Sequence, residues 1–185
     1  MSQTMNYPEP LRTLMPEGAE MELAAGQPRQ QMRAALAKFD LAAAIEPRQV
    51  VDPSMALACQ SGLWLAHNFL DESHEISQQI ETPTGSFWHA MMHRREGDFD
   101  NAAYWFRRVR EHAIFQPLGA AVALEEASDP QLASLMPAGR WDPLAFVQLV
   151  RSVVAGRTGK PTAAACRRIA RLEWQLLWDF CYQQA

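Results

Sequence analysis

Residues 82–109 read TPTGSFWHAMMHRREGDFDNAAYWFRRV, and this stretch decides the fold. Turn-forming residues fill its start, at 82–86, and they predict a turn there, followed by a helix from about Ser86 to Arg95. The triplet EGD at 96–98 breaks that helix, because glycine favours a helix end and aspartate favours the cap of the next helix. A second helix is then expected as far as about His112. The stretch therefore predicts a helical hairpin at the centre of the protein.

Further helices are predicted on both sides of this hairpin. Their sequences are rich in good helix formers, and aspartate or proline stands at several of their starts. No alternating pattern of valine, isoleucine or threonine predicts a strand. The expected helices cover about 28–46, 52–80, 117–127, 143–155 and 161–182, and the second of these is the longest. The expected fold class is all-α, a single-domain orthogonal helical bundle of six to seven helices.

The beginning of the chain differs in composition from the rest. Residues 1–26 hold three prolines and little periodicity, so they are predicted to form an irregular N-terminal arm with one short helical turn around 11–14. Residues 27–185 are predicted to form a single helical domain. The N-terminal sequence also lacks the basic start and apolar run of a signal peptide.

Composition excludes several classes of protein. The chain has 185 residues, a hydrophobic fraction of 48 % and a net charge of −4. That charge gives no general attraction to nucleic acids or anionic membranes, and no apolar run approaches the roughly 20 residues that span a bilayer. The three cysteines form no CxxC pair and are expected as free thiols in a reducing compartment. We therefore expect a cytoplasmic protein with no nucleic-acid or membrane partner.

Groups able to bind metal or move protons are concentrated in one part of the chain. Four of the five histidines lie between His67 and His93, interleaved with Asp71, Glu72 and Glu75. Histidine serves both kinds of chemistry near neutral pH. A continuous helix to about residue 80 would place His67, Asp71 and His74 on one stripe, because successive residues turn by about 100°. That stripe lies at the border between core and solvent, where a cleft wall is expected.

The next helix repeats this arrangement. His89 and His93 are four residues apart, so their imidazoles leave the same face of the helix and can bind one ion. If the two helices pack antiparallel through the short turn before residue 86, His74 comes close to His89. We therefore predict a site for a divalent metal, either zinc, iron, manganese or nickel, and with it a hydrolase, lyase or oxygenase that acts on a small anionic molecule. The predicted ligands are His67, Asp71, His74, His89 and His93.

Residues that would hold such a substrate are predicted beside the histidines. Trp88 lies next to the face that carries His89 and His93, and arginines follow closely in sequence. Arg94 or Arg95 together with Arg108 can form a clamp for a carboxylate or a phosphate. The alternative for these arginines is a solvated surface with salt bridges. The motifs HExxH of zinc proteases and the duplicated ExxH of di-iron bundles are both absent, so neither mechanism is indicated.

Two resemblances concern the hairpin. The string EGDFDNAAYWFRRV resembles the second helix of a tetratricopeptide repeat, with a Gly-Asp turn, a small residue at Ala102 and an aromatic at Phe106; no second copy follows at a 34-residue period. Residues 60–110 also resemble an uncharacterised family of helical proteins that carries the same run from DESH through TPTGSFWHAMMHRR to YWFRRV. That resemblance implies a helical fold and adds no chemistry.

Two alternatives to a metal-dependent enzyme remain open. The first is a non-enzymatic, tetratricopeptide-like helical module that binds a peptide or protein partner, in which the histidines are structural and bond carboxylates or backbone carbonyls. The second is a metal-free pocket that binds or senses a ligand and whose histidines titrate. Histidine nitrogens that converge within roughly 4 Å would favour a metal, and nitrogens bonded to separate carbonyls would favour a structural role.

Overall fold

The computed structural model describes residues 5–126 and 129–185, and every regular element within them is a helix, which confirms the predicted all-α bundle. Short helices come first, and the long ones follow from residue 53. The elements are α1 (Glu9–Arg12), η1 (Gln30–Met32), α2 (Arg33–Ala37), α3 (Leu41–Ala44), α4 (Pro53–Ala66), α5 (Leu70–Ser77), α6 (Pro83–Glu96), α7 (Phe99–Val109), α8 (Phe115–Glu126), η2 (Pro130–Leu135), η3 (Pro137–Gly139), α9 (Pro143–Val154) and α10 (Lys160–Gln184).

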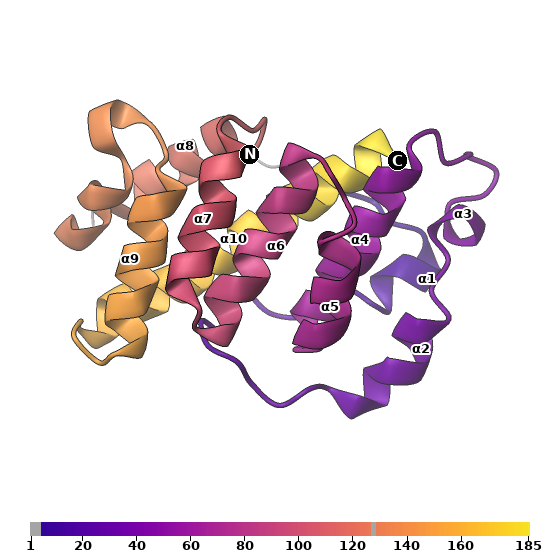
Figure 1. The fold of residues 1–185 in the computed structure, drawn as a ribbon, viewed down its shortest axis with the longest axis horizontal. Helices are drawn as coiled ribbons and strands as arrows, with labels where there is room; N and C mark the ends of the chain where they lie inside the picture. Colours follow the sequence, from indigo (N-terminus) through magenta and orange to yellow (C-terminus); the bar gives the residue numbers. More distant parts are fainter. Residues whose placement is uncertain (1–4, 127–128) are drawn as a thin grey trace.

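The long helices form two layers. Figure 1 shows α9, α7, α6 and α5 following one another across the molecule, with α10 running behind them. The predicted hairpin is α6 and α7, and it lies at the centre of this arrangement. Trp88 of α6 and Trp174 and Trp178 of α10 are fully buried between the layers. Gly62 lets α4 approach them, since a Cβ at this position would lie 2.7 Å from the Trp88 ring.

Several long helices begin where capping residues predict. The side chains of Asp52, Thr82, Asp98 and Asp142 each accept a hydrogen bond from a backbone N–H in the first turn of the helix that follows. Proline occupies the first position of three of these helices, where its missing N–H costs nothing. The sequence therefore predicts the starts of α4, α7 and α9 correctly.

The helix predicted over 28–46 is wrong as one element. The chain forms η1 and α2, breaks after Ala37, and resumes as the short helix α3. Asp40 causes the second start, because its carboxylate accepts a hydrogen bond from the Ala42 N–H at 2.9 Å. The residues on both sides of Asp40 are good helix formers and predict one continuous helix, so the sequence pattern does not indicate this break.

The long helix predicted over 52–80 is also wrong, and this error matters for the site. Helix α4 ends at Ala66 and α5 starts at Leu70, with Asn68 between them in the left-handed region at φ 62°. The Asn68 side chain donates to Glu22 at 2.9 Å and accepts from Arg95 at 2.7 Å. The break therefore turns the chain, and His67 no longer shares a helical face with His74.

Residues 5–26 of the N-terminal arm are irregular except for α1, and they pack on the helices. Leu11 and Leu14 are buried in the same core as the tryptophans. The Tyr7 hydroxyl bonds to Asp179 of α10, which fixes the arm against the longest helix. The three cysteines are buried free thiols. Within the described ranges, no helix combines the length and the apolar character that crossing a membrane requires.

Candidate metal centre

Three histidines from two helices meet at the surface between α5 and α6. The ring of His74 lies 4.7 Å from that of His89 and 5.3 Å from that of His93, measured between ring centroids, and the rings of His89 and His93 are 4.7 Å apart. One nitrogen from each ring can be chosen so that all three lie within 4.8 Å of one another. The proximity of His74 and His89, expected from antiparallel packing, is confirmed.

A tight turn between α5 and α6 creates this proximity. Thr82 begins α6, and its hydroxyl accepts a hydrogen bond from the Gly85 N–H at 3.1 Å. A Cβ at Gly85 would lie only 2.1 Å from the carbonyl oxygen of Ile80, so this position accepts no side chain. The close approach of the two helix ends places His74 of α5 opposite His89, which lies two turns into α6.

The rings of His74 and His89 have no hydrogen-bond partner among residues 5–126 and 129–185, and the Nδ1 of His89 is buried without one. A buried nitrogen without a partner costs free energy, so such an atom calls for an explanation. Burial, followed by the neighbouring rings of His93 and His74, lowers the pKa of His89 to about 4. His89 is therefore neutral at pH 7, which is the form that binds a metal ion.

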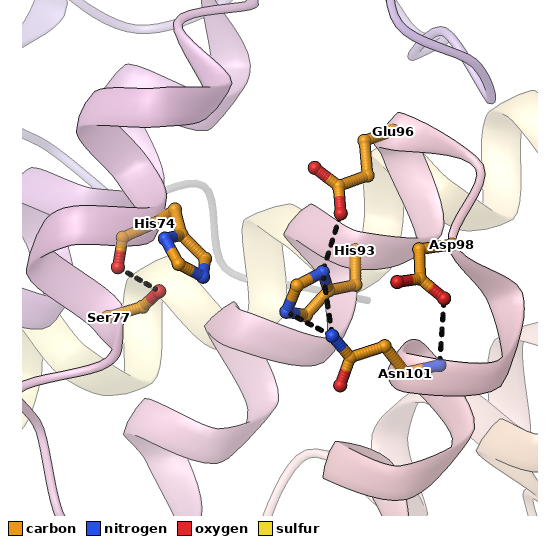
Figure 2. A network of polar contacts seen from close by, with 6 residues as sticks. All are labelled: His74, Ser77, His93, Glu96, Asp98 and Asn101. Carbon is orange, nitrogen blue, oxygen red and sulfur yellow. Dashed lines mark hydrogen bonds and ion pairs between the residues drawn. The ribbon is translucent and has the colours of Figure 1, made fainter.

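The ring of His93 has side-chain partners in Glu96 and Asn101, as Figure 2 shows. Its Nδ1 lies 2.6 Å from an oxygen of Glu96, and its Nε2 lies 3.1 Å from the amide nitrogen of Asn101 on α7. This arrangement assigns the proton to Nδ1, which donates to the carboxylate, and leaves the lone pair on Nε2. A carboxylate that orients a histidine in this way is typical of metal sites. An ion at Nε2 competes with the Asn101 amide for that lone pair.

A second group of ligand atoms overlaps the first at His93 and includes Glu96 and Asp98. Both carboxylates are exposed, and each already accepts a hydrogen bond within the protein. Glu96 accepts from His93, and Asp98 accepts from the Asn101 N–H at 3.1 Å as the cap of α7. These two residues therefore fit a supporting role better than direct ligation. The three histidines are the better donor set.

Trp105 of α7 closes one side of the histidine group. Its ring stacks on His89, with centroids 4.2 Å apart and planes inclined by 21°. The structure leaves this tryptophan partly exposed at the site. Asn101, Trp105 and Arg108 recur at i, i+4 and i+7, and this spacing is the signal that could have identified a face directed at the histidines.

Two of the five predicted ligands lie outside the group. His67 caps the end of α4, and its Nε2 bonds to the carbonyl oxygen of Leu14 at 2.8 Å, which is a structural role. Asp71 lies on α5 with its side chain exposed. The break at Asn68 separates His67 from His74. The stripe His67–Asp71–His74 predicted from one continuous helix does not form.

Three of the four predicted substrate residues are also placed elsewhere. Trp88 is fully buried and its indole N–H points to the Cys181 sulfur at 3.4 Å. Arg94 is buried in an ion pair with Glu173, and Arg95 is buried against Asn68. Arg108 alone is exposed on the site side of α7, with its guanidinium 5.2 Å from the centre of the Trp105 ring. The predicted clamp of Arg94 or Arg95 with Arg108 is therefore wrong.

The fifth histidine gives a prediction about stability. Burial lowers the pKa of His112 to about 4, and its ring packs on Phe87 and Phe180. Because an unfolded histidine titrates near 6.5, stability is complete above that pH and is lost progressively as the pH falls toward 4. Between pH 7 and pH 5, His112 alone should remove about 2 kcal/mol from the free energy of unfolding. Urea unfolding at both pH values should show a smaller loss for His112→Gln than for the wild type, and equal losses would refute the assignment.

The geometry of the three histidines can accept a metal ion. Zinc binds imidazole nitrogens at about 2.0–2.1 Å, so three ligands of one ion lie roughly 3.4 Å apart. Nitrogens that lie within 4.8 Å of one another reach this spacing only after ring rotations that close gaps of up to about 1.4 Å. Three imidazole ligands would leave one position of a tetrahedral ion open for water or substrate. No protein-family model, curated protein or solved structure matches this chain.

Proposed function

We propose that this protein binds one divalent metal ion through His74, His89 and His93 and acts as a metal-dependent enzyme on a small anionic molecule. The observation that carries the proposal is the convergence of one ring nitrogen from each of three histidines within 4.8 Å, in a group where the His89 ring also has a buried Nδ1 without a hydrogen-bond partner. A ligand set of three imidazoles favours zinc, and also accepts iron, manganese or nickel. The buried free cysteines fit a reducing compartment, so we propose a cytoplasmic location.

The residues around the histidines each have a part in this proposal. Glu96 holds the Nδ1 proton of His93 and so directs Nε2 at the ion. Trp105 fixes the plane of the His89 ring by stacking on it. An ion with an open position acidifies bound water and polarises a carbonyl or phosphoryl oxygen. The sequence has no GxSxG motif and the three cysteines are buried, so water activated in this way is the reactant that we propose for the site.

Metal analysis of untagged protein tests this proposal. After incubation with zinc and removal of the excess, the wild type should retain close to one ion per chain. His89→Ala and His93→Ala should retain almost none, because each removes one of only three ligands. His112→Gln is the matched control, since it also replaces a largely buried histidine but leaves the three ligands intact.

A wild-type protein that does not retain zinc would support one of the metal-free functions. If the wild type retains no ion, and the histidine variants only lower the thermal stability, the histidines are structural and the metal proposal fails. If His112→Gln releases the ion together with the other two variants, the ion is bound elsewhere or the variants are unfolded. Circular dichroism of each variant separates these two cases.

A further inference from the structure

We propose that a groove next to the three histidines binds the anionic group of a small organic ligand, and that Arg108 is the side chain that holds it. The groove has a volume of about 790 Å³ and includes Ser86, Trp105 and Arg108 in its lining. Binding of the anion in the groove does not require the proposed metal centre. Only the statement that the other end of the ligand lies beside an ion rests on that centre.

Contacts between α6 and α7 show where the groove lies relative to the histidines. His93 of α6 meets Asn101 of α7, and one turn along, His89 meets Trp105. The two helices run antiparallel, so the next positions in the same direction are Ser86 on α6 and Arg108 on α7. Both line the groove. The groove is therefore the continuation of the histidine site by one further turn, about 5 Å along the helices.

The lining of the groove is strongly positive. Arg107, Arg108 and Arg110 all contribute to it, against the single carboxylate of Glu81. Within the described parts of the chain, none of these three arginines lies within 4.0 Å of a carboxylate oxygen, whereas seven arginines elsewhere do. Three unpaired guanidinium groups around one hollow attract an anion, and the attraction is strongest at low salt.

Arg108 is the best placed of the three. Its guanidinium lies 5.2 Å from the centre of the Trp105 ring and 5.9 Å from that of Tyr104. Its Nη1 donates to the Tyr104 hydroxyl at 3.5 Å. Contacts on aromatic faces hold a guanidinium in place without using up its donors, so most of them stay available for a carboxylate or phosphate. The Trp105 ring contacts His89 as well as Arg108, so the arginine lies beside the proposed metal centre.

This arrangement defines the class of ligand. An anionic group on Arg108 lies about one helical turn from His89, the nearest of the three histidines, so a second oxygen a few bonds away reaches the histidine group. Trp105 lies between the two ends and lines the groove, so the part of the ligand that joins them passes an apolar side chain and suits a short carbon skeleton. The ligand is thus a small organic anion with a carboxylate or phosphate at one end and an oxygen-bearing group at the other.

Isothermal titration calorimetry at low salt tests the proposal with two probes, inorganic phosphate and succinate. Titrations into metal-free protein measure the groove by itself, and titrations into zinc-treated protein add the ion. Arg108→Gln should weaken binding of the preferred probe by roughly tenfold to hundredfold, because it removes a charged hydrogen-bonding partner. Arg157→Gln is the control, since Arg157 is exposed in the loop between α9 and α10 and should change nothing.

Each outcome decides a different point. Tighter binding of succinate identifies a carboxylate ligand, and tighter binding of phosphate identifies a phosphate ligand. Equal affinities of the wild type and Arg108→Gln in metal-free protein overturn this inference, even where zinc binds. Anion binding that depends on Arg108 in a protein that takes up no zinc keeps the groove and rejects the metal centre.

Discussion

Replacing Glu173 with leucine is expected to lower the free energy of unfolding by about 3–5 kcal/mol. Glu173 of α10 is fully buried and forms a two-pronged ion pair with Arg94 of α6, whose side chain is 5 % exposed. Leucine removes the negative charge and leaves the guanidinium buried without a partner. An unpaired buried charge is far more costly than the pair, because nothing replaces the water that the charge has lost.

A double variant separates two contributions to the free energy of unfolding, namely the cost of a buried charge without a partner and the stabilisation by the ion pair itself. Arg94→Met with Glu173→Leu should recover most of the lost stability, since two apolar side chains of similar size replace the pair without leaving a charge. The phenyl ring of Phe146, 4.5 Å from the Arg94 guanidinium, already provides an apolar neighbour for methionine. Urea unfolding of the two single variants and the double variant measures the difference.

An exposed ion pair is the matched control. Arg151 and Asp100 lie 3.4 Å apart, with side chains 48 % and 89 % exposed. Asp100→Asn should therefore cost less than about 1 kcal/mol. A similar cost for Glu173→Leu and Asp100→Asn would contradict the burial of the Arg94 pair, and would return Arg94 to the residues available for a ligand.

Helix starts could be predicted from the sequence wherever the signal is local. Asp52, Asp98 and Asp142 cap their helices with their own side chains, and the residues that follow are good helix formers. The break at Asn68 could not be predicted in this way. Its partners are Glu22 and Arg95, which are far away in the sequence, so only the folded chain brings together the groups that stabilise the left-handed turn.

The candidate site follows the same rule as the helix starts, because local spacing could be predicted from the sequence and contacts between distant residues could not. His89 and His93 share a face because they are four residues apart, and the short turn before α6 brings His74 to them. His67 would belong to this group only if α4 and α5 formed one continuous helix, and the break between them removes it. Arg94 stands next to His93 in sequence, yet it points to α10 and pairs with Glu173. Neighbours in sequence on a helix face different sides, and only packing decides which side becomes a site.

Zinc at 100 to 1,000 times its dissociation constant is expected to raise the melting temperature of the wild-type protein by about 5–16 °C. An ion that binds only the folded state adds about 2.7 kcal/mol at 100 times its dissociation constant and about 4.1 kcal/mol at 1,000 times. Each kcal/mol moves the melting temperature of a domain of this size by about 2–4 °C.

Differential scanning calorimetry with three ions and three variants makes this result specific. Zinc and nickel should both raise the melting temperature, and magnesium should not, because magnesium prefers oxygen ligands and binds imidazole poorly. The increase should vanish in His74→Ala and His93→Ala and persist in His112→Gln. Each ligand variant keeps two histidines, so a residual shift in either would indicate a weaker two-ligand site. An equal increase in all three variants would mean that the ion stabilises the protein somewhere other than between α5 and α6, and the three-histidine centre would then be rejected.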